Sequence, residues 1–468
     1  MAAAGPRRQP LECLDGNRTQ GQPHVTSTGA SGPPPPAGDS QAPSARRIRL
    51  HGWRHPAILA LAATAMASGF AQFAATAALG DIARAFGKET GPSGSVVAEV
   101  GLSGTTLGVG LAIIRLASLG ALPLAALGDR HGRRRVLLGS VAAGLAVTAV
   151  AALSPGYWWF VVLFALARPL LSATNALDGV VAAEETRTRD RAKAIALVTA
   201  GYGIGAGLNP LIRGVAGEGL GFRGLFALAL VPLAVTPLLA RWLEEPDRYQ
   251  RLRVAADPAT AAVRPRVLGR IRADLRPRLR LLAVLAFAIA FVTGPANTFL
   301  FVYAENALGM SRSATAAMFV VGGGPVALVG LLLGRWGADA LGRRRTAGGT
   351  QAVVALACML TYSGSRPAVV AGYLLGILAA SAYGPSFGAL SAELFPTSVR
   401  ATVAGWLFGV AGVVGAVAGL VAFGRLADVL ASFAGAAVLV AAPVVLVSLL
   451  FAGLPETRGR ELEQTAPE

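Results

Sequence analysis

Two arginines lie inside long apolar segments of this sequence, where an ionised side chain costs at least a few kcal/mol. Arg115 comes 14 residues before Asp129, which is roughly 21 Å along a helix at 1.5 Å per residue. Arg168 is near the middle of the apolar segment 157–182. Guanidinium groups bind carboxylates through several donors. We therefore expect both arginines to supply positive charge for an anionic solute such as an organic acid. The alternative is that each bonds helix carbonyls or snorkels.

Other polar side chains recur in the apolar segments at helical spacing. Ser172 and Asn175 share the face of Arg168. A polar stripe at this depth should face a cavity. A similar stripe in segment 57–79 consists of Ser68, Gln72 and Thr76. The candidate substrate-binding residues are Gln72, Arg115, Arg168, Ser172, Asn175, Asn297 and Tyr383.

The segment 280–303 contains Gly294 and Pro295 beside Thr293 and Asn297. Proline has no N–H to donate and disturbs the turn before it. We therefore expect a helix break that frees backbone carbonyls at this point.

The sequence contains no recognisable catalytic or metal-binding constellation. Its histidines lie in tail or loop segments, and HExxH, CxxC and the phosphate-binding GxxxxGK[ST] are all absent. Cys13 and Cys358 cannot form a disulfide framework, because one lies in a polar tail and the other in an apolar segment. His51 and His55 could hold a metal, although such a pair is more typical of an interface. We expect no enzyme activity, no metal and no cofactor.

The composition is that of a membrane protein. Of 468 residues, 54% are hydrophobic and only 14% are charged. A bilayer-spanning helix needs about 20 mostly apolar residues. The sequence therefore predicts an all-α integral membrane protein with 12 transmembrane helices, at 57–79, 98–127, 135–153, 157–182, 192–214, 224–243, 280–303, 314–338, 345–363, 367–390, 401–424 and 430–453.

The distribution of cations predicts the orientation. If the amino terminus is cytoplasmic, the inner loops hold 24 of the 42 cations and the tails nine, against seven in the outer loops. This asymmetry is typical of the positive-inside rule and of contact with anionic lipids. It accounts for the net charge of +17 without nucleic-acid binding. We expect a multi-pass protein of the plasma membrane with both termini cytoplasmic.

Composition also predicts the domain boundaries. The segment 1–54 is rich in Pro, Gly and Ser and has no apolar core, so we expect a disordered cytoplasmic tail. Two six-helix bundles should follow, at 55–243 and 280–454. A basic cytoplasmic linker at 244–279 joins them, and 455–468 forms a second cytoplasmic tail.

The two predicted bundles share sequence features at one period. LGDRHGRRR and DALGRRR place Asp129 and Gly132 210 residues before Asp339 and Gly342. EETRTRDRA and ELFPTSVRA repeat Glu, Thr, Arg and Ala at an offset of 209. Six helices per copy is an even number, so the sequence predicts two parallel repeats.

At this point the sequence resembles the major facilitator superfamily from about residue 55 to 458. The resemblance rests mainly on the loop signature G-x-L-A-D-R-x-G-R-R, which is present as ALGDRHGRRR with Ala125 in place of the first glycine. The resemblance implies a transporter that works by alternating access, with substrate touching helices 1, 4, 7 and 10. It also implies a monomeric carrier of a small solute with an optional proton partner, although helix 1 lacks the carboxylate that many proton-coupled relatives carry.

A carboxylate beside a tight glycine turn can accept charge-assisted bonds from arginine or from helix N-termini. In the superfamily such loops act as latches that hold the cytoplasmic ends of the two halves together in one state. The resemblance gives these gating candidates: Asp129, Arg130, Arg133, Glu184, Arg191, Asp339, Arg343, Glu393 and Arg400.

Further segments are most similar to the sugar-porter and metabolite/proton-symporter branch. They are LEEPDRY at 243–249, LPETRGRELE at 454–463 and VTGPANTFLFVYAENALGMS at 292–311. Against this, Gly205, Pro210 and Gly214 match part of a drug-antiporter pattern. Uptake of a sugar, organic acid or related metabolite is the favoured interpretation. Efflux and a non-transporting receptor or scaffold are the alternatives.

Overall fold

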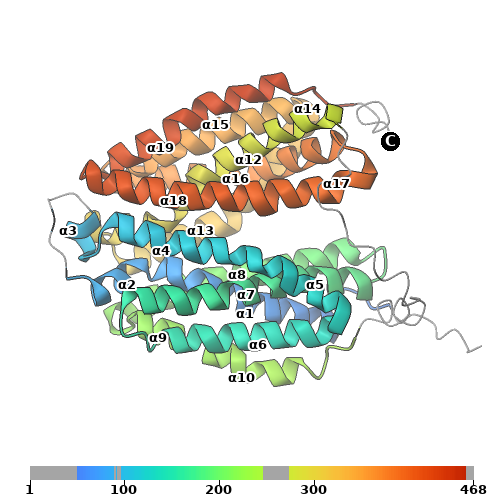
Figure 1. Cartoon of the computed structure of the whole chain (residues 1–468), viewed down its shortest axis with the longest axis horizontal. Helices are drawn as coiled ribbons and strands as arrows, with labels where there is room; N and C mark the ends of the chain where they lie inside the picture. The colour runs from blue at the N-terminus through green and yellow to red at the C-terminus, as the bar shows by residue number, and fades with distance from the viewer. Residues whose placement is uncertain (1–49, 89–90, 92–95, 246–272, 460–468) are drawn as a thin grey trace, which may run out of the picture. The chain divides into compact units, whose positions relative to one another are not determined.

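The computed structural model describes residues 50–88, 91, 96–245 and 273–459. The predicted tails and linker fall largely outside these residues, and so does the side chain of Asp129. Ile48–Glu468 form one compact unit, shown in Figure 1. The regular secondary structure of its described part is helical, apart from an isolated bridge between His51 and Thr186.

The helices of the first half run from α1 to α10, and those of the second half from α12 to α19 (Figure 1). Those of the first half are α1 Pro56–Ala77, α2 Leu79–Phe86, α3 Val96–Val100, α4 Gly104–Ala117, α5 Ala121–His131, α6 Arg133–Ala151, α7 Tyr157–Glu185, α8 Arg191–Ala216, α9 Phe222–Ala227 and α10 Leu230–Leu239. Those of the second are α12 Arg276–Thr298, α13 Arg312–Val321, α14 Ala327–Ala340, α15 Arg343–Thr361, α16 Arg366–Glu393, α17 Thr397–Ala404, α18 Gly412–Val429 and α19 Phe433–Val447.

Each predicted span has a helical counterpart. Eleven spans in the described part are long and apolar enough to cross a membrane. The twelfth position is filled by α15, a 19-residue helix whose first turn consists of three arginines, which lowers its hydropathy. It packs between α16 and α19. The predicted all-α fold of two parallel six-helix repeats is confirmed.

Several spans consist of more than one helical piece. The predicted span 98–127 is α4 and α5 joined by a 3₁₀ turn at Ser118–Gly120. Pro123 follows this turn and cannot donate a backbone hydrogen bond to it. π-helical turns at Gly322–Val326 and Gly405–Ala411 join α13 to α14 and α17 to α18.

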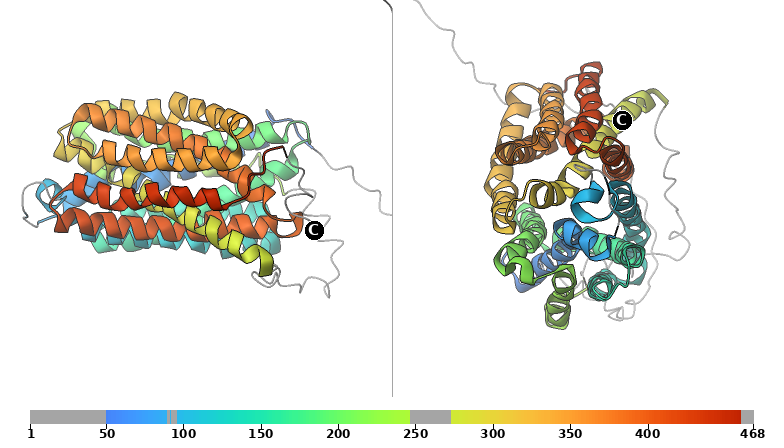
Figure 2. Two further views of the ribbon diagram at one scale, coloured as in Figure 1. Left: turned by 90° about the horizontal axis from the view of Figure 1, so that it is seen from above. Right: turned by 90° about the vertical axis from the view of Figure 1, so that its left-hand side faces the viewer.

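The same helix pairs pack in both halves. α1 packs against α8 and α12 against α18, with glycines at the contacts: a Cβ at Gly205 would overlap the Met66 carbonyl, and one at Gly419 the Phe291 carbonyl. Close helix approach through glycine is typical of membrane bundles. The views along and across the helices show the two halves side by side (Figure 2).

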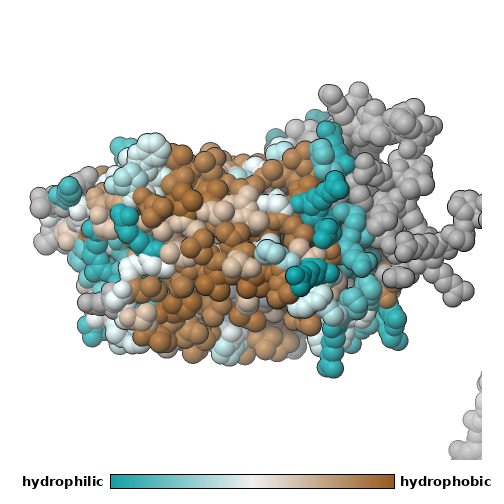
Figure 3. Space-filling model, turned by 90° about the horizontal axis from the view of Figure 1, so that it is seen from below, coloured by the Kyte–Doolittle hydropathy of each residue, from teal (hydrophilic) through white to brown (hydrophobic). Residues whose placement is uncertain are grey.

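Two related helix pairs join the halves: α4 with α18, and α8 with α13. We call the end at which the described chain begins and finishes the termini end, and the opposite one the distal end. One face of the unit carries a broad apolar band with hydrophilic residues toward both ends (Figure 3). Across the described part of the chain, the exposed apolar side chains include Leu153, Leu166 and Trp336. This is the surface expected of a protein surrounded by lipid.

Candidate functional site

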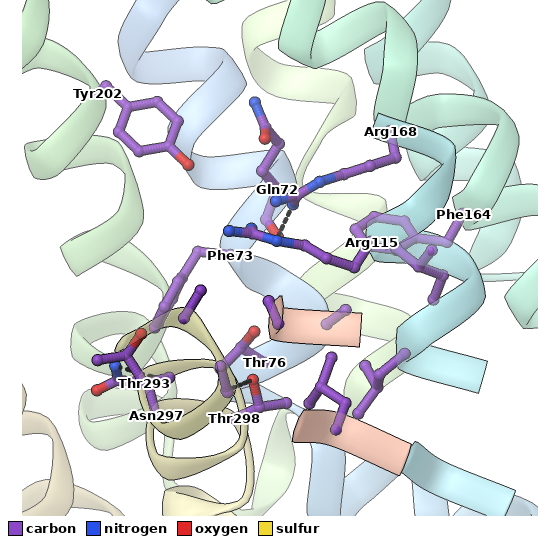
Figure 4. Close-up of a pocket in the computed structure, with 17 residues that line it drawn as sticks. Gln72, Phe73, Thr76, Arg115, Phe164, Arg168, Tyr202, Thr293, Asn297 and Thr298 are labelled. Atoms are coloured by element: carbon purple, nitrogen blue, oxygen red, sulfur yellow. Dashed lines mark hydrogen bonds between the residues drawn. The ribbon is translucent and has the colours of Figure 1, made fainter. Parts of the chain in front are cut away.

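A cavity of about 270 Å³ lies between the two halves. α1, α4, α7 and α8 line it from the first half, and α12 and α18 from the second (Figure 4). Its lining residues are Gln72, Phe73, Ala75, Thr76, Leu111, Ile114, Arg115, Phe164, Arg168, Tyr202, Ala290, Thr293, Gly294, Asn297, Thr298, Ala416 and Leu420. A site for a small molecule needs such an apolar wall with a few convergent polar groups.

Arg115 and Arg168 supply the charge of this cavity. Their guanidinium groups extend side by side into the same part of it (Figure 4). The Arg168 Nη1 donates to the Gln72 carbonyl at 3.1 Å, while its buried Nε has no partner among the described residues. The lining residues include no carboxylate. Two like charges repel each other, so an anion bound between them would lower the electrostatic free energy.

Hydrogen bonds between α1 and α7 hold this charged side of the cavity in place. The Gln72 Nε2 donates to the Ser68 Oγ at 2.9 Å, and the Ser68 Oγ donates to the Leu171 carbonyl at 2.9 Å. Ser68 is fully buried, and Gln72 is 5% exposed. The Gln72 carbonyl also accepts a hydrogen bond from Arg168. This line of contacts between α1 and α7, which we call the seam, therefore orients the guanidinium group.

The second half contributes a neutral polar side. Asn297 Nδ2 donates to the Thr293 carbonyl at 3.0 Å, and Thr298 Oγ1 donates to the Gly294 carbonyl at 2.7 Å. The helix break expected at Gly294 and Pro295 is wrong, because α12 continues to Thr298. The Phe291 carbonyl, which lacks a donor from Pro295, instead lies against the Cα of Gly419 in α18.

The structure brings together four of the seven candidate substrate-binding residues: Gln72, Arg115, Arg168 and Asn297. Ser172 lies beside this group, with its Oγ 3.5 Å from the Gln72 Oε1. Asn175 has a buried Oδ1 without a described partner and does not line the cavity. Their roles in binding stay predictions.

Tyr383 lies elsewhere, stacked on Phe387 with ring centroids 4.9 Å apart. Helix 10, which corresponds to α16, was expected to line the main cavity, but none of its residues does so. α16 reaches only a neighbouring space of about 40 Å³, which shares Thr293 and Asn297 with the main cavity. α8 contributes Tyr202 to the lining. Sequence reasoning missed the contribution of α18, because its lining residues, Ala416 and Leu420, are apolar residues in an apolar span and give no local signal of a cavity.

At the termini end, ion pairs join helices of the same half. Arg133 pairs with Glu184, and Arg343 pairs with Glu393, with the Arg343 Nε 2.8 Å from the Glu393 Oε2. These two pairs occupy equivalent positions of the repeat. Arg400 donates to the Ala392 carbonyl at 2.8 Å. A latch between the halves at this end, as the resemblance implied, stays a prediction.

The other gating candidates take no ion pair within the described part of the chain. Arg130 and Asp339 are exposed, and Arg191 is half-buried, with an Nε that has no described partner. The side chain of Asp129 lies outside the described structure.

A repeated helix cap at this end was not expected. The Glu245 carboxylate accepts from the backbone N–H of Arg133 at 2.5 Å and of Arg134 at 3.1 Å. Glu456 does the same for Arg343 and Arg344, at 2.9 and 3.3 Å. Both caps begin at a glycine with positive φ, Gly132 or Gly342. The signal was present in LEEP and LPET, whose glutamates lie 211 residues apart.

At the distal end, a buried ionic network joins the halves. Arg213 lies 2.9 Å from Asp81 in its own half and 2.9 Å from Glu305 in the other, and its side chain is only 2% exposed. Arg312 of the second half forms an ion pair with Asp81 of the first half, at 2.7 Å. Burial raises the pKa of Glu305 above its ordinary value, while the positive charge of Arg213 opposes this rise.

A second distal contact joins α4 to α18. The Asp428 carboxylate accepts from the backbone N–H groups of Gly104 and Thr105, each at 2.7 Å. Gly104 and Gly424 contact each other so closely that a Cβ at Gly424 would overlap the Gly104 carbonyl oxygen. The structure thus has its distal end closed above the cavity.

A two-fold repeated helical unit with a polar cavity between its halves defines a membrane carrier for small solutes. The family model described as Major Facilitator Superfamily matches residues 61–338, and that described as Sugar (and other) transporter matches 244–468. The chain belongs to the Major Facilitator Superfamily. It is a multi-pass membrane transporter of small organic solutes and not an enzyme, which confirms the resemblance to the sugar and metabolite branch.

Individual relatives agree with this assignment. The chain is 27% identical to the cis,cis-muconate transport protein of Acinetobacter baylyi, over 60% of this chain and 69% of that one. It is 26% identical to the gallate transporter of Pseudomonas putida, over 68% and 76%. Its fold is similar to that of a D-xylose–proton symporter, with a TM-score of 0.66 at 18% identity over 86% of this chain and 99% of that one.

Proposed function

We propose that this transporter carries small organic acids, as anions, into the cell across the plasma membrane. The observation that carries the proposal is the pair Arg115 and Arg168 in a cavity whose lining contains no carboxylate. Relatives named for muconate and gallate support it, because both of these solutes are carboxylates. Phe73, Phe164 and Leu111 provide an apolar wall against which the carbon skeleton would pack.

The termini end is proposed to face the cytoplasm. The excess of cations in the loops at that end supports this orientation, and it also favours contact with anionic lipid. We propose a monomer of two bundles, 55–243 and 280–454, that rock about the central cavity. In the state described here, Arg213 and Arg312 close the path to the outside. Coupling to protons is part of the proposal.

Efflux is the weaker direction. The residues that resemble a drug-antiporter pattern have a packing role in this structure. A Cβ at Gly205 would overlap α1, and one at Gly214 would lie 2.9 Å from the Ala316 Cβ of α13. Helix packing therefore accounts for both glycines without an export function.

Uptake by vesicles with purified protein tests the substrate class. Labelled muconate and gallate would be compared with D-xylose, in wild type and in Arg168→Gln. Loss of a hydrogen-bonded charge costs about 1.5–3 kcal/mol, so we expect apparent carboxylate affinity to fall roughly 10- to 150-fold. Arg168→Lys should recover part of it. Arg189→Gln is the control, because the Arg189 side chain is 76% exposed in a loop.

Equal loss of carboxylate and xylose transport in Arg168→Gln would contradict charge recognition. Transport of xylose alone by the wild type would refute the organic-acid proposal. Uptake only by vesicles in which the termini end of the protein faces outward would favour efflux.

A further inference from the structure

One carboxyl group in the membrane-embedded part has no role in the cavity or in the ionic contacts described above. Asp178 of α7 is fully buried, and its Oδ2 has no hydrogen-bond partner within the described structure. Its Oδ1 lies 2.8 Å from the Thr64 Oγ1 of α1. The surrounding helix faces carry a buried apolar cluster that includes Leu61, Ala65 and Val181.

The charged groups around Asp178 do not neutralise it. α1 carries no charged residue, and Arg168 is ten residues away on α7, which is roughly 15 Å along the helix. The charged or titratable groups on α7 and on the helices packed against it near this point are Arg130, His131, Arg133, Arg134, Arg135, Glu184, Glu185, Arg191 and Lys193. None of them forms an ion pair with Asp178 within the described part of the chain, from which the side chain of Asp129 is missing.

The hydrogen bonds of Thr64 allow a protonated carboxyl group at Asp178. The Thr64 Oγ1 lies 2.8 Å from the Leu61 carbonyl oxygen as well as 2.8 Å from Asp178. A hydroxyl group has one hydrogen, and a carbonyl oxygen can only accept. When Thr64 donates to Leu61, Asp178 must be the donor in the other contact. A buried carboxylate with one unpartnered oxygen would also be strongly disfavoured.

A line of buried polar groups connects Asp178 with the cavity. Thr64, Ser68 and Gln72 lie one turn apart on α1, and Gln72 donates to Ser68. The Gln72 carbonyl in turn accepts from Arg168. A change in packing at Asp178 would thus act on the same two helices, α1 and α7, whose contacts orient the Arg168 guanidinium group.

We propose that Asp178 binds the proton that moves with each solute molecule. A hydrogen ion from water forms the O–H bond of the carboxyl group, and the same bond later releases it to water on the other side. The neutral form fits the packed seam between α1 and α7, whereas the ionised form requires water and loosens the seam. This inference rests on the proposed function, since it assumes that the chain carries a solute.

Two transport measurements separate the proposals. Exchange of labelled for unlabelled muconate, without a pH gradient, tests solute transport alone. Accumulation driven by one pH unit at zero membrane potential tests coupling, and one proton per solute supports up to about tenfold accumulation. Empty vesicles correct for leakage. We expect Asp178→Asn to keep exchange and lose accumulation, because its amide retains the shape and the donor of the protonated acid.

The exposed Glu244 provides the control, and Glu244→Gln should retain both activities. Undiminished accumulation in Asp178→Asn, or exchange without accumulation in the wild type, would overturn the proton role. Absence of exchange in the wild type would instead refute the proposed function. Infrared spectroscopy gives a readout independent of solute: at neutral pH the wild type should show the C=O stretch of a buried protonated acid. A wild type without this band, or a band of undiminished intensity in Asp178→Asn, would also overturn the assignment of the proton to Asp178.

Discussion

Replacement of Arg213 by glutamine should shift the carrier toward a state that is open at its distal end. Arg213 contacts Asp81 within its half and Glu305 across the halves, and all three side chains are at least nine-tenths buried. Removal of one partner from a buried ion pair costs about 3–5 kcal/mol. Asp81 keeps its ion pair with Arg312 in this variant, so part of the interaction free energy of Asp81 is retained. We therefore assign about 3 kcal/mol to the contact between the halves, equivalent to roughly a 100-fold change in population.

The assay is the reaction of a cavity cysteine with a membrane-impermeant thiol reagent added from the distal side. Thr76 lines the cavity. Thr76→Cys would therefore serve as the reporter, in a chain whose Cys13 and Cys358 are replaced by alanine. The labelling rate should rise by about two orders of magnitude with Arg213→Gln. Arg84→Gln is the matched control, because Arg84 contacts the same Asp81 without bridging the halves and is 50% exposed. An unchanged rate in Arg213→Gln would refute the gating role.

The pH dependence follows from Glu305. Its pKa is raised by burial in the closed state, and opening would hydrate the carboxyl group and return its pKa toward the ordinary value. The closed state thus binds this proton more tightly, so acid favours closure, and the contribution is lost as pH rises through the raised pKa. Without Arg213 the pKa should rise further. The intrinsic reaction of the cysteine also slows at acid pH because the thiolate is protonated, so the labelling rate is divided by that of a free thiol at each pH. This ratio should fall for Arg213→Gln as pH falls, and a ratio that rises at acid pH would contradict this sign.

Two further predictions concern packing and capping. Gly424→Ala should hinder distal closure, because its Cβ would overlap the Gly104 carbonyl. Transport should therefore fall with little change in thermal stability. Gly412→Ala on the same helix should be tolerated, because its Cβ would meet only the Leu407 carbonyl oxygen, at 3.5 Å. Glu245→Ala removes the cap on Arg133 and its neighbour and should cost about 1–2 kcal/mol. Thermal unfolding measures that loss, and an unchanged midpoint would count against the cap.

The sequence was sufficient to predict the fold, because length and hydropathy of a span are local properties. The boundaries shifted by a few residues, and α15 shows how arginines in a first turn lower the apparent hydropathy of a packed helix. The break expected at Pro295 did not form, since the carbonyl that lost its donor lies against Gly419 of another helix. That neighbour could not be identified from the segment alone.

The candidate site was predictable where charge entered an apolar segment. Arg115 and Arg168 stand out against their surroundings, and the structure places both at one cavity. The distal network was not predicted, although its residues were visible as charges near helix ends. Glu305 meets Arg213 only because the two halves face each other, and a repeat detected in sequence does not state which surfaces of its copies meet.

The glycine contact between α4 and α18 also limits how the halves can move. At Gly104 and Gly424, main chain touches main chain with no side chain between them. A slide of one helical turn, about 5.4 Å, would bring Leu420 or Asp428 to the position of Gly424 and force the helices apart. Shear along the helix axes is therefore blocked. Opening of the distal end therefore requires α4 and α18 to tilt apart at this contact rather than to slide past each other.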